Sequence, residues 1–256
     1  MRLTQLILEN FRNCDNFELN INPDEFLTCI TGKNAQGKTN ILEAIYMLAL
    51  TRSFRAIDQK ETIQWGKQYA KIHGVFNQTV SKTSSAPDQN LNNESIRNIG
   101  GTNLHAPDTA STEKSNIHLE VFRGLPPYPQ KILKKNGIQI KTEDFIAMCK
   151  VVFFHPQNLN MLYLGPDLRR HYIDTINVQI NKKFYNSIQV YSRVLKQRNW
   201  QLKNIKMGKG NDNSLEVWNQ QLILHGSFIM AERAKTINFI QKHLQGCYQK
   251  IAHNND

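Results

Sequence analysis

Long apolar runs are missing from this 256-residue chain. No stretch approaches the roughly 20 consecutive apolar residues that a membrane-spanning helix requires. Residues 1–9 include charged side chains and alternate between apolar and polar residues. They therefore lack the continuous apolar segment of a signal peptide. We therefore expect a protein that has no membrane partner, and we predict a cytoplasmic location.

Cysteine is scarce and scattered. The 4 cysteines lie far apart, at Cys14, Cys29, Cys149 and Cys247, and none forms a CxxC pair or stands beside histidines at a metal-binding spacing. This pattern argues against a disulfide framework and gives no support to a zinc site. The sequence predicts reduced thiols that are buried in the fold.

Acidic residues are also in short supply. Lys and Arg number 32 against 21 Asp and Glu, so the formal net charge is +11. A cytosolic protein with such an excess commonly binds polyanions. No amphipathic stretch combines a basic face with Trp or Phe anchors, which disfavours a membrane surface as the anionic partner. Nucleic acid is the favoured partner class.

The shortage of acidic residues is greatest between Asp174 and Asp212, where none occurs. Several cations in this span can meet DNA phosphates without reading the base sequence. The alternative is that they form an ordinary solvated helix face. The candidate DNA contacts are Lys182, Lys183, Arg193, Lys196, Arg198 and Lys203.

Strands are predicted throughout the first half of the chain. Alternating apolar residues favour half-buried strands, and short continuous apolar runs favour strands that are buried on both faces. Residues 17–21 and 117–121 alternate, and residues 26–30 and 151–154 are short continuous runs. The apolar run at residues 6–8 and the segment 70–76 are two further predicted strands. Asn136-Gly137 predicts a two-residue hairpin.

The pattern divides the chain into two domains. Residues 1–165 read as an α/β lobe, and residues 166–256 read as a helical lobe because their apolar residues recur at spacings of three, four and seven. Within the first lobe, residues 77–116 are rich in Ser, Thr, Asn, Gly and Pro. Such a composition predicts a polar, mobile insertion.

A phosphate-binding loop stands out in the first lobe. The segment matches G-x-x-x-x-G-K-[ST], follows a predicted buried strand and precedes an amphipathic helix over residues 39–50. The glycines let backbone amides turn toward phosphate oxygens. The lysine places a charge against the β and γ phosphates of ATP, and the hydroxyl of Thr39 can ligate Mg²⁺. The candidate ATP-binding residues are Gly32, Lys33, Asn34, Ala35, Gln36, Gly37, Lys38 and Thr39.

The chain closely resembles RecF proteins. The likeness rests on separated blocks that occur in order and cover most of the chain outside residues 77–116. The blocks are residues 8–13, 32–46, 52–55, 152–159, 165–174 and 191–199.

The resemblance implies a P-loop NTPase with an ABC/SMC-like head lobe and an inserted helical lobe. Members of the family close as ATP-dependent homodimers on single-stranded or gapped duplex DNA. With RecR and RecO they assist recombinase loading in replication, recombinational repair and SOS induction. The resemblance also implies that Arg12, at the tip of the first strand, lies near the nucleotide phosphates.

Later motifs of the family do not occur in this sequence. It has no L-S-x-G-Q-like signature, and no apolar strand ends in the acidic pair of a Walker B motif. The family resemblance implies a slow DNA-stimulated ATPase, whereas the missing motifs predict a truncated member that binds ATP without hydrolysing it. Two alternatives stay open: a P-loop kinase of a small molecule, and a non-functional truncated remnant.

Overall fold

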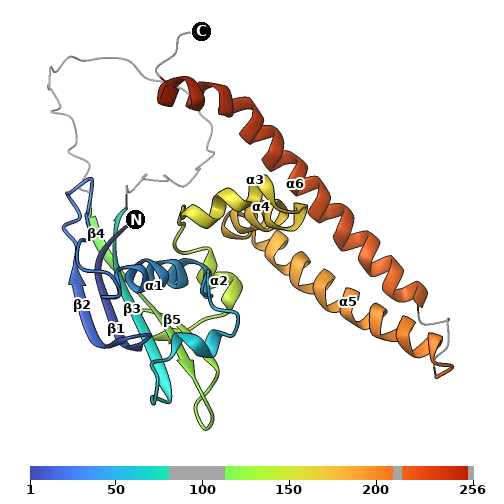
Figure 1. Cartoon of the computed structure of the whole chain (residues 1–256), viewed down its shortest axis with the longest axis horizontal. Helices are drawn as coiled ribbons and strands as arrows, with labels where there is room; N and C mark the ends of the chain where they lie inside the picture. The colour runs from blue at the N-terminus through green and yellow to red at the C-terminus, as the bar shows by residue number, and fades with distance from the viewer. Residues whose placement is uncertain (81–112, 210–214, 253–256) are drawn as a thin grey trace, which may run out of the picture.

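The first lobe is built on an antiparallel sheet of six strands, in the order β2-β1-β3-β4-β5-β6. The fold is a computed structural model that describes residues 1–80, 113–209 and 215–252. The strands are β1 (Arg2–Phe11), β2 (Cys14–Asn20), β3 (Tyr69–Val80), β4 (Glu113–Gly124), β5 (Lys131–Lys135) and β6 (Ile138–Gln139). Figure 1 shows the helix α1 (Lys38–Leu50) lying across one face of this sheet.

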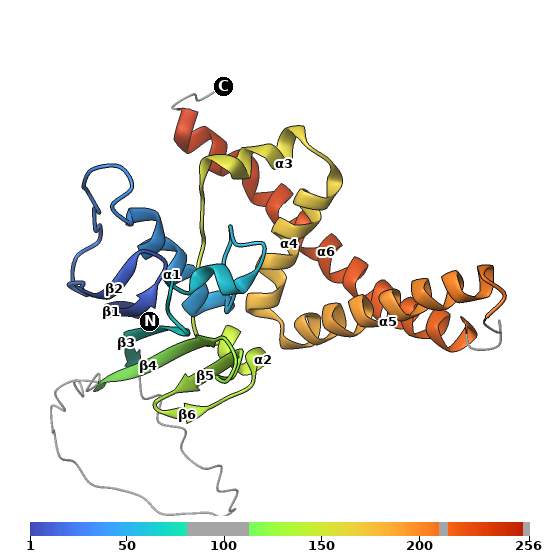
Figure 2. The same cartoon turned by 60° about the horizontal axis from the view of Figure 1, so that its bottom comes forward.

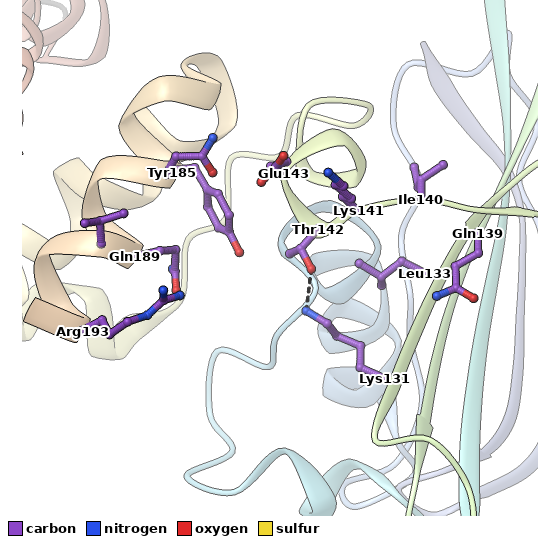
Figure 3. Close-up of a pocket in the computed structure, with 12 residues that line it drawn as sticks. Lys131, Leu133, Gln139, Ile140, Lys141, Thr142, Glu143, Tyr185, Gln189 and Arg193 are labelled. Carbon is purple, nitrogen blue, oxygen red and sulfur yellow. Dashed lines mark hydrogen bonds between the residues drawn. The ribbon is translucent and has the colours of Figure 1, made fainter.

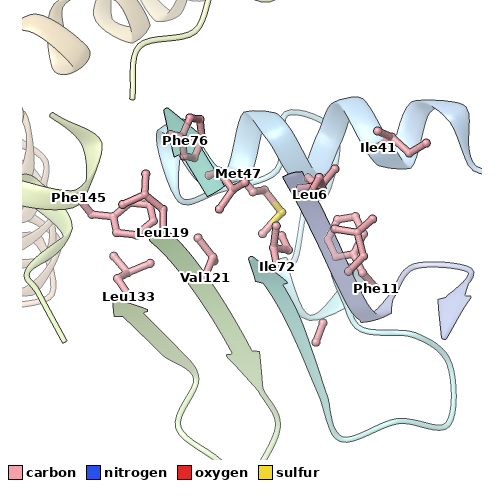
Figure 4. Close-up of a cluster of buried hydrophobic side chains, with 14 of the residues drawn as sticks. Leu6, Phe11, Ile41, Met47, Ile72, Phe76, Leu119, Val121, Leu133 and Phe145 are labelled. Carbon is pink, nitrogen blue, oxygen red and sulfur yellow. The ribbon is translucent and has the colours of Figure 1, made fainter. Parts of the chain in front are cut away.

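The core of the lobe forms where α1 packs on the sheet. Every second residue of the central strands faces the helix, including Leu6 and Ile72, and Met47 and Leu48 of α1 belong to the same core. Figure 4 shows the side chains of Leu6, Met47 and Ile72 meeting in one layer. The period of two along the strands and of 3.6 along the helix therefore places both apolar faces in the same core.

The predicted hairpin is confirmed. Asn136 (φ 50°) and Gly137 (φ 81°) connect β5 to β6, and both have positive φ. Two successive positive φ values are what a type I′ turn requires, and Asn-Gly adopts them at low cost.

Two continuous apolar runs do not form the strands that were predicted. Phe26 is 97% exposed and Leu27 is 73% exposed, while Val152 is 95% exposed and Phe154 is 69% exposed. Both runs are without strand pairing in the described part of the chain. A strand that is buried on both faces needs neighbours on its edges, and hydrophobicity alone does not supply them.

The two ends of the predicted polar insertion, residues 77–116, lie in strands. Its first residues belong to β3 and its last to β4, with Asn77 opposite Asn116 and Val80 opposite Glu113. Backbone pairing in the ladder overrides the polar composition of these strand ends. Residues 81–112 lie outside the described residues.

After β6, the regular secondary structure in the described part of the chain is helical. Short helices α2 (Thr142–Ile146), η2 (Pro156–Leu159) and α3 (Asn160–Tyr163) lead to three longer ones. The longer helices are α4 (Pro166–Ile180), α5 (Lys182–Lys206) and α6 (Leu215–Ala252). α4 begins where the helical lobe was predicted to begin, and the division into two domains stays a prediction. Among the described helices, none is both long and apolar enough to cross a membrane.

A polar ladder joins α4 to α6. Arg233 donates from Nε and Nη2 to the two carboxylate oxygens of Asp174, each over 2.7 Å. One turn further along, Thr236 donates from Oγ1 to Oδ1 of Asn177 over 2.7 Å. Asn177 is only 2% exposed, so a shift in the register of these helices would leave its buried side-chain oxygen without a hydrogen-bond partner.

The cysteine prediction is wrong in part. All 4 thiols are free, but Cys29 and Cys247 are exposed, because one lies in the unpaired run before the phosphate loop and the other on the far half of α6.

Candidate functional site

The predicted phosphate loop leads directly into α1. Gly32 (φ 150°), Ala35 (φ 64°) and Gly37 (φ 90°) all have positive φ. Gly37 is also the N-cap residue of α1, and a Cβ atom at this position would lie 3.0 Å from Oδ1 of Asn13. The loop therefore needs glycine at position 37 for both its backbone conformation and its close neighbour.

Lys38 lies across the mouth of this loop. Its Nζ donates to the carbonyl oxygens of Gly32 and Lys33, both over 2.7 Å. The ammonium group is thus held at the turn of the loop, beside the first free amides of α1, where the helix favours an anion.

Thr39 is exposed on the first turn of α1. Among the described residues, no group of three or more His, Cys, Asp or Glu side chains could hold a metal ion. Mg²⁺ usually takes one or two protein oxygens and completes its shell with substrate phosphates and water. The single hydroxyl of Thr39 fits that role only together with a bound nucleotide.

Behind the loop, Glu43 of α1 anchors a cluster of cations. It is fully buried, and its carboxylate accepts from Arg12 (Nη2, 2.6 Å; Nε, 3.0 Å), from Arg55 (Nη2, 2.7 Å; Nε, 2.9 Å) and from Ser53. Burial works to raise the pKa of Glu43, but the hydrogen bonds from Arg12, Arg55 and Ser53 outweigh it, so its pKa lies below the ordinary value. The carboxylate is therefore ionised at neutral pH and serves as a structural counter-charge.

Arg12 is occupied by this cluster. Besides Glu43, its guanidinium donates to the carbonyl oxygen of Glu61 over 2.7 Å. The next residue, Asn13, accepts a hydrogen bond from Asn40 of α1 and lies against Gly37. The tip of β1 thus braces the phosphate loop from behind, and a direct contact of Arg12 with phosphates stays a prediction.

Sequence reasoning missed Glu43, Ser53 and Arg55 as members of one cluster. The available signal was a glutamate among the apolar residues of α1, two positions after Ile41 and one before Ala44, both of which are buried. Because a buried carboxylate requires a partner, this position could have predicted the arginines.

The predicted DNA-binding cations of α5 fall on two faces of the helix. Lys183 lies over the ring of Phe228, with Nζ 4.9 Å from its centroid, and Arg198 donates from Nε to Oδ1 of Asn219 over 2.7 Å. Both contacts are with α6. These two cations are therefore engaged between helices.

The other face of α5 is more open. Arg193, Lys196 and Lys203 are exposed. Lys182 is exposed as well, but its Nζ lies 2.6 Å from Asp144 and 3.8 Å from Glu143 of α2. The structure therefore separates the predicted set into exposed, paired and interhelical cations.

A family model described as an AAA ATPase domain matches residues 1–255. The chain belongs to this AAA ATPase domain family.

Curated relatives define its place more closely. The DNA replication and repair protein RecF of Latilactobacillus sakei is 31% identical over 253 residues, which covers 98% of this chain and 57% of the relative. The protein of the same name from Oceanobacillus iheyensis is 32% identical over 254 residues, with 98% and 58% covered. The chain thus spans somewhat more than half the length of these relatives, and the resemblance to RecF proteins is confirmed.

A solved structure agrees with the fold. The recombination mediator protein RecF with ATP, from the RecFOR pathway, superposes with a TM-score of 0.75 at 24% identity, covering 98% of this chain and 58% of that one. The predicted fold, an α/β P-loop lobe joined to helices, is confirmed.

Proposed function

We propose that this chain is an ATP-binding and DNA-binding protein of DNA replication and repair. The observation that carries the proposal is the phosphate loop, in which Lys38 spans the carbonyls of Gly32 and Lys33 at the N-terminus of α1. The names of the curated relatives support the biological setting. The open cations of α5 support contact with a polyanion.

The nucleotide is held by the backbone amides of residues 32–37, the ammonium of Lys38 and the dipole of α1. Mg²⁺, bound with the nucleotide through the hydroxyl of Thr39, would neutralise phosphate charge there. The tip of β1 keeps the loop in shape through Asn13 and the Glu43 cluster.

The finer parts of the proposal follow the family. ATP bridges two heads, the homodimer grips single-stranded or gapped DNA without reading its sequence, and nucleotide loss releases it. RecR and RecO are the proposed partners in recombinase loading, recombinational repair and SOS induction, in the cytoplasm. We further propose that residues 1–165 form the nucleotide-binding lobe and residues 166–256 the helical lobe.

Titration with a fluorescent ATP analogue tests the nucleotide part. Lys38→Ala is expected to weaken binding at least tenfold, because it removes a charge-assisted contact with the phosphates of about 1.5–3 kcal/mol. Lys60→Ala is the matched control, since Lys60 is an exposed lysine outside the loop. Equal affinities for the wild-type protein and Lys38→Ala would show that the loop does not hold the nucleotide.

A further inference from the structure

A cleft of about 820 Å³ lies away from the phosphate loop. It is lined by the β5–β6 hairpin, α2 and the first half of α5. Figure 2 shows the hairpin and α2 together at the edge of the sheet, with α5 leading away from them. In Figure 3, Tyr185, Gln189 and Arg193 of α5 lie across the cleft from Lys131 and Thr142.

The cleft is cationic. Lys131, Lys141 and Arg193 line it, and the one carboxylate among its described lining residues, Glu143, has Lys182 at 3.8 Å. Positive charge in the cleft is therefore incompletely balanced by the protein.

Two of the nearby cations are desolvated. Burial lowers the pKa of Lys131, and the neighbouring Arg123 lowers it further, while burial also lowers the pKa of Arg123. Nε of Arg123 is buried without a hydrogen-bond partner in the described part of the chain. Lys131 has three N–H donors, of which one reaches Oγ1 of Thr142 over 2.8 Å. An anion in the cleft would offset the cost of bringing these charges together.

The open face of α5 extends the cleft. Residues three or four apart share a helix face, so Gln189 and Arg193 in the cleft are followed on the same face by Lys196 and Trp200. Lys196 is exposed, and Trp200 is 65% exposed. With Lys203 at its far end, this face continues for about 15 Å beyond Arg193, at about 1.5 Å per residue.

Cations interleaved with exposed aromatic side chains are the features that bind single-stranded nucleic acid. The cleft adds the ring of Tyr185, the amides of Asn186 and Gln189, and the apolar side chains of Leu133 and Val190. This combination suits a flat base with a phosphate attached. An acidic peptide has no flat bases that could stack on the indole of Trp200, which is spaced among the cations of α5.

We infer that the cleft holds one nucleotide unit of a single-stranded DNA, with its phosphate between Lys131 and Arg193, and that the strand continues along α5 past Lys196 and Trp200. The inference rests on the proposed DNA-binding function and assigns it a path. The proposed path does not involve the residues of the phosphate loop.

Fluorescence anisotropy with a short labelled oligothymidylate, measured at several salt concentrations, tests the path. Lys131→Met and Arg193→Gln are each expected to weaken binding about tenfold, because each removes a charge-assisted contact. Each is also expected to make the logarithmic salt dependence shallower by about 0.7, the value for one phosphate contact in single strands. Lys242→Gln removes an exposed lysine of α6 outside the cleft, and it should change neither quantity.

Melting temperature and ATP affinity are measured for every variant, to show that folding and the nucleotide site are intact. If Lys131→Met does not fold, Arg193→Gln carries the test, because Arg193 is exposed on a helix. Equal strand affinity and salt slope in all variants would overturn the path but leave the proposed function standing. If the wild-type protein binds ATP but does not bind the oligothymidylate, both the path and the DNA-binding part of the proposed function are wrong.

Thymidine monophosphate is the second probe, because a free nucleotide carries the same phosphate and base. We expect it to compete only weakly, since it lacks the contacts along α5. Complete displacement of the strand by equimolar mononucleotide would show that the cleft serves free nucleotides, and the strand path would be wrong.

Discussion

Glu43 is the residue whose replacement tests most directly how the phosphate loop is supported. Glu43→Gln keeps the length and nearly the volume of the side chain but removes its charge. Arg12 and Arg55 then lose their shared counter-charge, and Gln offers one carbonyl oxygen where the carboxylate offered two. The change therefore isolates the charge from the packing.

Glu43→Gln is expected to lower the free energy of unfolding strongly for so small a change in the side chain. Removing one partner of a buried ion pair typically costs 3–5 kcal/mol. The Arg12 side chain is 17% exposed and that of Arg55 is 36% exposed. Water can therefore solvate part of both guanidinium groups, and Gln retains some of the hydrogen bonds. We therefore expect the free energy of unfolding to fall by about 2–3 kcal/mol.

Urea denaturation measures this loss as a lower midpoint with an unchanged slope. Glu120→Gln is the matched control, because Glu120 also bridges two cations, Lys71 at 3.2 Å and Lys134 at 2.9 Å. Those lysines are 39% and 37% exposed, so we expect a cost below about 1 kcal/mol. If the two variants lose the same stability, the Glu43 cluster is not the structural anchor that its burial indicates.

Two further predictions concern pH and turnover. The pKa of folded Glu43 lies below the ordinary value of 4.5, so its contribution to stability is complete above that pH and is lost as pH falls through the folded pKa. The stability gap between the wild-type protein and Glu43→Gln should thus be constant near neutral pH and close in acid, and a gap that widens in acid would contradict this sign. Secondly, phosphate release from ATP by the 256-residue chain should stay at background with or without DNA, because Glu43 is tied to Arg12 and Arg55 and Asp174 to Arg233, which leaves neither carboxylate to position water. Turnover that Lys38→Ala abolishes would reveal a catalytic carboxylate elsewhere.

Features encoded by local chemistry could be predicted from the sequence. The phosphate loop is specified by glycines at fixed spacing and by the apolar stripe of the helix that follows. The hairpin is specified by Asn136 and Gly137, which adopt positive φ. In both cases the residues that decide the structure are neighbours in the chain, so no knowledge of distant contacts was required.

Features that depend on a distant partner were not predictable in the same way. Residues 26–30 and 151–154 have the composition of central strands, but a strand forms only beside another strand. The cations of α5 could be found by their charge, but which of them face α6 depends on how the two helices pack. Arg12 was placed near the loop through the family resemblance, whereas its engagement with Glu43 depends on the tertiary approach of β1 to α1.

The ladder between α4 and α6 also has a mechanical consequence. Asp174–Arg233 and Asn177–Thr236 lie midway along the 38-residue α6. From Thr236 to Ala252 the helix continues for about 24 Å, so tilting it by about 10° at the ladder would carry its end roughly 4 Å, given a rise of about 1.5 Å per residue. A repacking of α4 that tilted α6 at this ladder would therefore be amplified into a much larger displacement at the far end of the helix.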